Sequence, residues 1–321
     1  MTAVETLVGV APIPFPQPGR FLHHGADERD PTHPPRGGMM MAKRKVLMTG
    51  ATGYIASQML PRFREVYDLT LIDVKETGPT GARVPGTVIA DLVDPDLDRY
   101  RRHFQGVDTV VHLGFHRGSG RGATTTRRNT YADERANVDM AYNVYKVSHE
   151  EGVSRVVVAS SNHAADWWEP LIHQGKVDMV TPETYPRSDN FYGWAKATYE
   201  HLGFLFACGH FGRKLAMAQI RIGAPREISA QDFVGNPQGY HRDLGAYISP
   251  RDLTQLFEKS IEAQNIDDEW GIPFQIFYGI SDNARKFWGI ANARRVIGYA
   301  PDDDSEVKYW REIATYLMQQ T

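Results

Sequence analysis

Short apolar runs alternate with longer helical patterns through most of this sequence, from Lys43 onward. The runs are rich in β-branched residues and apolar on both faces, which is typical of strands in a parallel sheet that helices cover on both sides. The pattern therefore predicts an α/β fold with a doubly wound parallel sheet. The expected strands are Lys45–Thr49, Leu69–Val74, Thr87–Ala90, Thr109–Leu113, Arg155–Ser160, Leu215–Ile222 and Phe274–Tyr278, and the clearest expected helices are Ile55–Val66, Asp133–Glu151 and Phe191–Phe211.

Residues 1–42 differ in composition from the rest of the chain. They hold seven of the 19 prolines, four of which alternate with other residues between Pro12 and Pro18. Proline fixes φ and lacks a backbone donor, so this segment predicts an extended or disordered arm. Three consecutive methionines, Met39–Met41, are compatible with a translation start at that point. The alternatives are an arm that wraps a partner subunit and a disordered segment without a function. Residues 43–321 are expected to form a single domain.

The composition excludes several classes of protein. The formal net charge is −3, with 36 basic and 39 acidic residues, which gives no electrostatic reason to expect binding to nucleic acid or to a membrane surface. The single cysteine, Cys208, cannot form an intrachain disulfide and argues against a cysteine-built zinc site, and we expect no metal. Without an apolar stretch of about 18 residues or a signal-like N-terminus, the chain is expected to be cytoplasmic.

The first expected strand runs into a glycine-rich turn, Thr49-Gly-Ala-Thr-Gly-Tyr-Ile-Ala56, that opens a helix. Glycines let the backbone turn sharply and approach a pyrophosphate, and the helix N-terminus offers unpaired N–H groups and a positive dipole end. A glycine-rich turn alone is weak, but a strand before it and a helix after it are the required context. The candidate cofactor-binding residues of this turn are Gly50, Thr52, Gly53, Tyr54 and Ile55.

Asp73 ends the second expected strand, 23 residues after Gly50. A carboxylate there accepts hydrogen bonds from ribose hydroxyls and repels a 2′-phosphate, so the pattern favours NAD over NADP. The sequence thus predicts a Rossmann-type NAD-binding domain with a small C-terminal substrate-binding region. Residues that end the third and fourth strands are further candidates for contact with the cofactor: Asp91, Leu92, Leu113 and Gly114.

Tyr192 and Lys196 are four residues apart on an expected helix, so both side chains lie on one face. A lysine ammonium one turn away stabilises a phenolate and is expected to lower the pKa of the tyrosine. The phenolate would remove an alcohol proton while a hydride leaves for a nicotinamide. The same spacing recurs at Tyr142 and Lys146, where a solvated helix face is the better interpretation.

The fifth strand ends in Ser160-Ser161-Asn162-His163, and ligand sites in open parallel sheets form at the carboxyl ends of strands. A serine hydroxyl here would hold the substrate oxygen against Tyr192. Strand alternation places Ser160 and Ser161 on opposite sides, and the residues alone leave open which one faces the substrate.

These motifs together resemble the extended short-chain dehydrogenase/reductase superfamily, also called the NAD-dependent epimerase/dehydratase family, over about residues 43–321. The resemblance rests on the glycine-rich turn, Asp73, Asp91-Leu92, His112-Leu-Gly, Glu134-x-x-Asn137-Val138, Ser160-Ser161 and Tyr192-x-x-x-Lys196. It implies that Ser161, Tyr192 and Lys196 are catalytic. It also implies that Asn137, Tyr192 and Lys196 belong to the cofactor site.

Within that family the chain is similar to the uronate dehydrogenases, which share the segments Ala159–His163 and Tyr278–Asn283. This similarity implies that Asn162 and His163 contact a sugar acid and that Arg242 grips its carboxylate, since a guanidinium pairs with a carboxylate through two parallel hydrogen bonds.

The chain departs from that group at Ala224 and Arg117, where serines are usual, and in a 22-residue segment between Gly114 and Asn137. This insert carries Arg117, Arg121, Arg127 and Arg128, and the stretches Asp166–Asn190 and Glu227–Tyr240 are also long. Extra arginines favour an anion, and aromatic residues can stack on sugar rings, so the substrate could be larger or more acidic than a hexuronate. We expect the substrate-binding elements mainly in 162–190 and 224–300, with Arg117 and Trp288 among the substrate contacts.

The expected function is an NAD-dependent oxidoreductase that oxidises the anomeric hydroxyl of a sugar or sugar acid to a lactone, with Tyr192 as base. One alternative is a sugar or nucleotide-sugar epimerase or dehydratase that recycles its NAD. A second is a catalytically idle NAD-binding regulatory protein, against which the intact Ser161, Tyr192 and Lys196 argue. The family resemblance also implies a homodimer.

Overall fold

The computed structural model describes residues 42–117 and 129–318. Lys43–Thr321 form one compact unit of the chain. The proline-rich segment 1–41 lies outside the described residues, as do Arg121, Arg127 and Arg128 of the insert. Among the described residues, no helix is long and apolar enough to cross a membrane.

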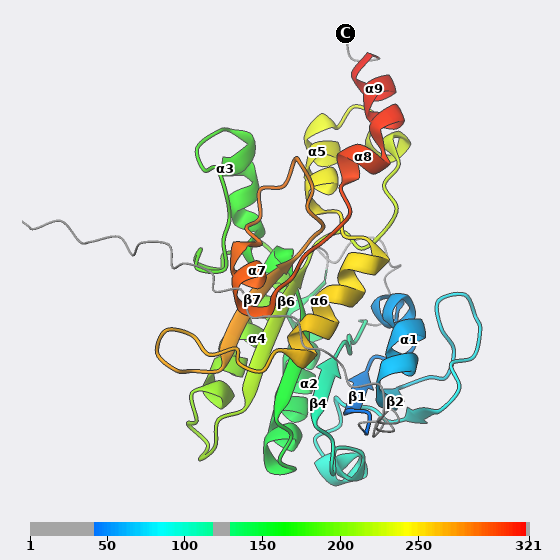
Figure 1. The fold of residues 1–321 in the computed structure, drawn as a ribbon, viewed down its shortest axis with the longest axis vertical. Coiled ribbons are helices and arrows are strands. Elements are labelled where there is room, and N and C mark those ends of the chain that lie inside the picture. Colours follow the sequence, from blue (N-terminus) through cyan, green and yellow to red (C-terminus); the bar gives the residue numbers. More distant parts are fainter. Residues whose placement is uncertain (1–41, 118–128, 319–321) are drawn as a thin grey trace, which may run out of the picture. The chain divides into compact units, whose positions relative to one another are not determined.

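Seven parallel strands form one sheet in the order β3-β2-β1-β4-β5-β6-β7 (Figure 1). The strands are β1 (Lys45–Thr49), β2 (Asp68–Asp73), β3 (Thr87–Ile89), β4 (Thr109–His112), β5 (Arg155–Ser161), β6 (Ala216–Ile222) and β7 (Phe274–Gly279). Every expected strand is confirmed to within one residue at each end. The strand order reverses between β1 and β4, which is the place where open α/β sheets bind ligands.

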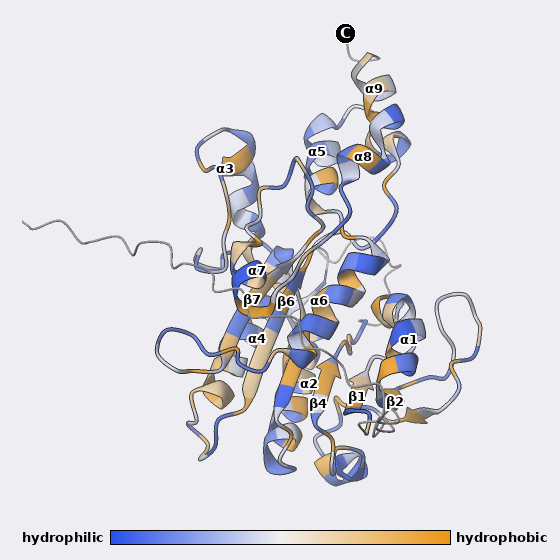
Figure 2. Ribbon diagram, in the orientation of Figure 1, coloured by the Kyte–Doolittle hydropathy of each residue, from blue (hydrophilic) through white to orange (hydrophobic). Residues whose placement is uncertain are grey.

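Helices cover both faces of the sheet, which makes it doubly wound as predicted. Helices α1 (Tyr54–Val66) and α6 (Pro250–Glu262) pack together on one face, and α2 (Tyr131–Glu150) and α4 (Phe191–Ala207) pack together on the other. Figure 2 shows the strands β4 and β7 largely in the hydrophobic colour, while α6 turns a hydrophilic side outward. Helix α4 ends at Ala207 rather than at Phe211, because Gly209 and Gly212 adopt positive φ angles of 82° and 106°.

The remaining elements lie mostly in the C-terminal half of the chain. They are η1 (Leu97–Arg99), η2 (Arg101–His103), η4 (Asn162–Trp168), α3 (Glu169–His173), η5 (Ala230–Phe233), α5 (Pro237–Ala246), α7 (Ala291–Ile297), α8 (Ser305–Lys308) and α9 (Trp310–Met318). Figure 1 shows α3, α5 and α8 beyond the upper end of the sheet, where β5 leads into η4. Two small apolar clusters stabilise this region separately from the main core, one around Trp288 and one around Tyr240.

Candidate active site

The glycine-rich turn brings the end of β1 against the end of β4. Gly50 has a φ of +64°, and a Cβ atom there would lie 2.6 Å from the backbone carbon and oxygen of Leu113. The backbone N–H of Gly114 donates to the Thr49 hydroxyl over 3.3 Å. Only glycine fits this turn, because any side chain would push the two strand ends apart.

The N-terminus of α1 is open, as an anion site requires. Its first flanking residue is Gly53, which makes no side-chain capping hydrogen bond, and the first turn contains no acidic residue. The Thr52 hydroxyl is buried without a hydrogen-bond partner in the described part of the chain. Free N–H groups, a hydroxyl and the positive end of the helix dipole converge here, so the residues fit a dinucleotide pyrophosphate.

Asp73 lies at the end of β2 and is held against the same turn. One carboxylate oxygen accepts from the backbone N–H of Thr52 over 2.9 Å, and the other accepts from Val74 over 2.7 Å. Each oxygen retains a further lone pair for a ribose hydroxyl, so the arrangement fits the adenosine end of NAD. Asp91 is exposed and accepts from the backbone of Val93, whereas Leu92 packs in the core beneath the sheet.

Asn137, an expected cofactor-site residue, forms hydrogen bonds with the backbone of the segment after β4. Its amide oxygen accepts from the backbone N–H of His116 over 2.7 Å, and its amide nitrogen donates to the His116 carbonyl over 3.0 Å. The buried side chain therefore braces the segment that leaves β4, which includes Leu113 and Gly114.

Ser161, Tyr192 and Lys196 meet where β5 ends and α4 begins. A hydrogen bond joins the side chains of Ser161 and Tyr192. The Lys196 ammonium donates to the Ala159 carbonyl over 2.9 Å and lies 5.6 Å from the centre of the Tyr192 ring. The Phe115 ring meets the Tyr192 ring edge-on at 5.7 Å. The structure thus brings the three expected catalytic residues together.

Gly193 makes this meeting possible. A Cβ atom there would lie 2.1 Å from the His163 carbonyl oxygen and 2.1 Å from the Ser188 hydroxyl, so only glycine allows the first turn of α4 to approach the end of β5 so closely. Asn190 caps that turn by accepting from the Gly193 backbone N–H over 3.0 Å.

The electrostatics of the catalytic residues differ from expectation. Burial raises the pKa of Tyr192 to about 12; the hydrogen bond with Ser161 lowers the pKa, and the negative charge of Glu134 raises it. Burial lowers the pKa of Lys196 to about 8, although Glu134 and Glu200 oppose that change. The predicted decrease in the Tyr192 pKa was therefore wrong for the structure as it stands, because removal from water disfavours the phenolate.

Glu134 is a buried carboxylate that the sequence analysis treated only as part of a motif. It accepts from the Asn129 amide over 2.5 Å and from the Asn137 amide over 3.3 Å. Burial raises its pKa, while the two amides and the Lys196 ammonium lower it. Glu134 is thus a counter-charge for Lys196.

The two serines have different partners on α4. Ser161 reaches Tyr192 in the first turn, whereas Ser160 donates over 2.7 Å to Glu200 farther along the helix. Glu200 also forms a two-pronged ion pair with Arg221, at 2.8 Å and 2.7 Å, and Arg221 donates to the Tyr278 hydroxyl over 2.9 Å. This network is buried, so Ser160 serves the core rather than the substrate.

Asn162 and His163 follow directly on η4. The Asn162 amide nitrogen is buried without a hydrogen-bond partner among the described residues. The His163 ring meets Tyr192 edge-on at 5.7 Å, and its Nδ1 lies 3.0 Å from the Asp166 carboxylate. Burial raises the pKa of Asp166, but His163 and Ser188 outweigh that effect and leave the pKa below its usual range. His163 therefore lies beside Tyr192, and Asn162 is its neighbour in the chain.

Arg242 does not offer a free guanidinium. It forms a two-pronged ion pair with Glu169 on α3, at 3.2 Å and 3.1 Å, and a third hydrogen bond to Asp243 at 3.0 Å. Trp288 is fully buried, with the Arg242 guanidinium 5.5 Å from its ring centre and Phe287 stacked against it. In this arrangement Arg242 cannot grip a substrate carboxylate, and Trp288 cannot present its ring to a sugar. Arg117 is exposed at the edge of the described segment.

The second tyrosine–lysine pair lies on a solvated face, as predicted. Tyr142 is 42% exposed, and the Lys146 ammonium pairs with Glu150 on the same helix. Burial, rather than spacing, therefore distinguishes the pair at Tyr192 and Lys196.

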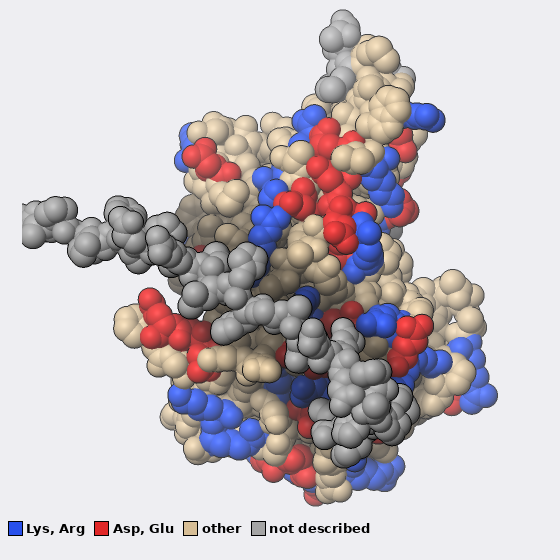
Figure 3. Space-filling view, in the orientation of Figure 1, with Lys and Arg blue, Asp and Glu red and all other residues tan. Residues whose placement is uncertain are grey.

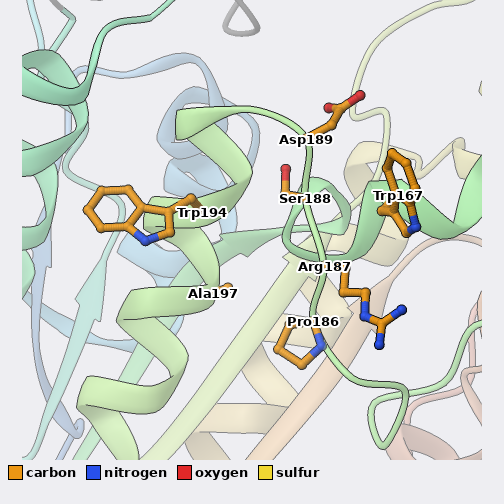
Figure 4. A pocket seen from close by; sticks show the side chains of 7 residues that line it. All are labelled: Trp167, Pro186, Arg187, Ser188, Asp189, Trp194 and Ala197. Carbon is orange, nitrogen blue, oxygen red and sulfur yellow. The ribbon is translucent and has the colours of Figure 1, made fainter.

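A surface pocket of about 410 Å³ lies beside the first turns of α4 (Figure 4). Figure 4 shows the segment 186–189 running between Trp167 on one side and Trp194 on the other. The pocket is lined by Trp167, Pro186, Arg187, Ser188, Asp189, Trp194 and Ala197. None of Ser161, Tyr192 and Lys196, the three expected catalytic residues, lines it.

The carboxylates around the site escaped prediction from the sequence. Glu169 and Glu200 each pair with an arginine that tertiary folding brings to them, and Asp166 pairs with His163 nearby in the chain. Only Asp166 had a local signal, since it lies three residues after His163. No group of three or more His, Cys, Asp or Glu side chains within residues 42–117 and 129–318 could hold a metal ion.

Comparison with known proteins finds relatives over most of the chain. The chain is 30% identical over 276 residues to an NAD-dependent glucose-6-phosphate dehydrogenase of Haloferax volcanii, covering 81% of this chain and 94% of that protein. It is 27% identical over 264 residues to a uronate dehydrogenase of Pseudomonas syringae pv. tomato, covering 82% and 83%.

Solved structures show the same fold. A mutated uronate dehydrogenase superposes with a TM-score of 0.64 at 24% identity, over 84% of this chain and 86% of that one. A UDP-galactose 4-epimerase superposes with a TM-score of 0.59 at 17% identity, over 86% and 99%.

The model of one family matches residues 46–207, which span the glycine-rich turn, the serine-bearing strand end and the helix of Tyr192 and Lys196. The chain belongs to the NAD dependent epimerase/dehydratase family.

Proposed function

We propose that this chain oxidises the anomeric hydroxyl of a sugar or sugar acid to a lactone, with NAD as hydride acceptor and Tyr192 as base. The observation that carries the proposal is the meeting of Ser161, Tyr192 and Lys196 at the carboxyl end of β5. The relatives named above are sugar or sugar-acid dehydrogenases, and an L-arabinose 1-dehydrogenase of Haloferax volcanii is a further one at 26% identity.

The residues of this chain divide the chemistry as follows. The N-terminus of α1 and Asp73 bind the dinucleotide, as their free donors and acceptors indicate. When bound, NAD supplies a hydride acceptor and the positive charge of its nicotinamide ring. The Ser161 hydroxyl donates a hydrogen bond to the anomeric oxygen and holds it against Tyr192. The Tyr192 oxygen removes the hydroxyl proton as the carbon–hydrogen bond breaks, and the Lys196 ammonium stabilises the phenolate.

Asn162 and His163 are proposed to hold the sugar. The buried Asn162 amide has an unused donor, and a buried donor without a partner is costly unless a ligand or water satisfies it. The Asp166 carboxylate orients the His163 ring, whose second nitrogen is then available to a sugar hydroxyl.

Two further expectations stay proposals. The exposed aromatic side chains of α2 and α4, such as Tyr131 and Trp194, support a homodimer through these helices. A cytoplasmic location remains a prediction from the sequence.

The test is a turnover assay of the purified chain with NAD and a panel of aldoses and uronates, followed by NADH absorbance. Net formation of NADH is expected, whereas an epimerase that recycles NAD would show none. Tyr192→Phe is expected to reduce kcat by at least about 1,000-fold, because general-base catalysis contributes on that order, while NAD binding measured by calorimetry stays within about twofold.

The matched control is Tyr142→Phe, which makes the same change on the solvated face and should retain wild-type kcat. If Tyr192→Phe retained a large share of the wild-type rate, another group would be the base. If no sugar produced NADH, the proposed oxidation would be wrong.

A further inference from the structure

An ion pair links α3 to α5 beyond the strand ends. Glu169 and Arg242 are 73 residues apart in the sequence, and the Nε and Nη2 atoms of the arginine donate to separate oxygens of the carboxylate. The Arg242 side chain is only 14% exposed and that of Glu169 only 10%, so water screens the pair weakly. This is the two-pronged geometry that a substrate carboxylate would need in order to bind Arg242.

The charges of the side chains next to this ion pair are also neutralised. The Nη1 atom of Arg242 donates to Asp243, and Asp243 also pairs with Arg226. Two arginines and two carboxylates therefore give this group no net charge. Figure 3 shows the wider pattern, in which Lys and Arg side chains lie beside Asp and Glu side chains over the region of α5 and α8.

A substrate anion could reach Arg242 only by displacing Glu169. The displaced carboxylate would stay largely buried beside the incoming anion, because α3 starts at Glu169 and follows η4 without a break. An unpaired buried charge and two adjacent like charges are both strongly unfavourable. Three of the five guanidinium N–H donors are in use, so the remaining two can still serve a neutral hydroxyl.

Burial lowers the pKa of Arg242, but Glu169 and then Asp243 outweigh that effect and raise it. The Arg242 guanidinium therefore keeps its positive charge throughout the physiological pH range.

We propose that Glu169 determines substrate specificity: by pairing with Arg242 it selects an aldose that is uncharged at the end facing Arg242, and it excludes a uronate. This inference rests on the proposed function, because it concerns the substrate of the same reaction. The similarity to uronate dehydrogenases assigns Arg242 to the carboxylate of the substrate. In this chain Arg242 instead binds the carboxylate of Glu169.

The experiment compares pairs of sugars that differ only at carbon 6. The kcat/KM with NAD is measured for glucose against glucuronate and for galactose against galacturonate, with glucose 6-phosphate as a second anionic probe. The wild-type chain is expected to prefer the neutral member of each pair by at least about tenfold, since opposing like charges costs several kcal/mol. Glu169→Gln keeps the size of the side chain, frees the arginine, and should move that ratio toward the uronate by at least about tenfold.

Two variants complete the design. Glu169→Asp retains the negative charge and should retain the preference for the neutral sugar. Glu258→Gln removes the carboxylate of the Arg62–Glu258 ion pair between α1 and α6, far along the chain from η4, and should leave the ratio unchanged. Thermal melting of each variant separates a change in specificity from a loss of folding, and the wild-type ratio tests the proposal even if Glu169→Gln does not fold.

The outcomes are distinct. A wild-type preference for a uronate or for glucose 6-phosphate would overturn the role of Glu169 while leaving the proposed oxidation intact. The same holds if Glu169→Gln folds and its ratio equals that of the wild type. Absence of NADH with every sugar would instead overturn the proposed function.

Discussion

The two halves of this sheet position their ligand-binding groups in different ways. The nucleotide half, β1 to β4 with α1, is shaped by backbone contacts, of which the approach of Gly50 to Leu113 is the tightest. The substrate half, β5 to β7 with η4, α3 and α5, is shaped by buried ion pairs, Glu200 with Arg221 and Glu169 with Arg242.

The two halves should therefore tolerate different amino-acid substitutions. A backbone cradle needs glycine at a few positions and is indifferent to most other side chains. A site held by ion pairs depends on both members of each pair, and loss of one member leaves a buried charge without compensation. We therefore expect changes in the nucleotide half to affect NAD binding and changes in the substrate half to affect folding, specificity or pH dependence.

Gly50→Ala is the most severe test of the nucleotide half. The added methyl group would overlap the Leu113 backbone at 2.6 Å, and the positive φ is itself unfavourable for alanine. We expect at least about a 100-fold weaker Kd for NAD, measured by calorimetry, because the strand ends must separate. Gly81→Ala is the control, since its φ is also positive, at +80°, but nothing lies within 4 Å of the new Cβ. Equal NAD affinity in both variants would contradict a cradle built from backbone contacts.

Glu200→Gln tests the substrate half. The change leaves the buried Arg221 guanidinium without a counter-charge, so the free energy of unfolding should fall by about 3–5 kcal/mol in a denaturant titration. A double variant that also carries Arg221→Met should recover part of this loss, because the uncompensated charge is gone.

The control for that change is Glu262→Gln, which breaks the half-exposed Arg44–Glu262 pair and should cost only about 0–1 kcal/mol. Equal destabilisation by the two single changes would show that burial of the ion pair is not what matters in the substrate half.

Glu134→Gln probes the junction of the two halves and should have the smallest effect. The Glu134 charge raises the pKa of both Tyr192 and Lys196, so its removal lowers both. A phenolate base gains activity as pH rises through its pKa, whereas a required ammonium loses activity as pH rises through its own. Both limbs of the kcat/KM profile should therefore move to lower pH.

Glu150→Gln is the matched control on the same helix, because Glu150 pairs with Lys146 and Arg101, away from the catalytic lysine. A profile that stays fixed or moves to higher pH in Glu134→Gln would show that Glu134 does not act on the catalytic pair.

The sequence predicted the fold almost completely. Strands and helices are local patterns of apolar residues, so β1 to β7 were found to within one residue at each end. The early end of α4 followed from Gly209 and Gly212, whose positive φ angles the apolar pattern does not reveal.

The candidate site was predicted only in part. Ser161, Tyr192 and Lys196 were placed together because strand ends and helical spacing are readable from the chain, and Gly50 and Asp73 were found for the same reason. Arg242 and Trp288 were assigned to the substrate from the similarity to uronate dehydrogenases, and the structure buries both against other side chains of the chain. The expected decrease in the Tyr192 pKa was also wrong, because burial raises that pKa and burial is not visible in a spacing.

By itself, the sequence determined the parallel sheet, the glycine-rich turn and the tyrosine–lysine pair, since each depends on residues that are near one another along the chain. Tertiary structure alone decided which charges are neutralised: Glu169 reaches Arg242 across 73 residues, and Glu134 lies close enough to Tyr192 and Lys196 to shift both pKa values. The physical reason is that electrostatic interactions depend on distance in space and on exclusion from water, and folding sets both.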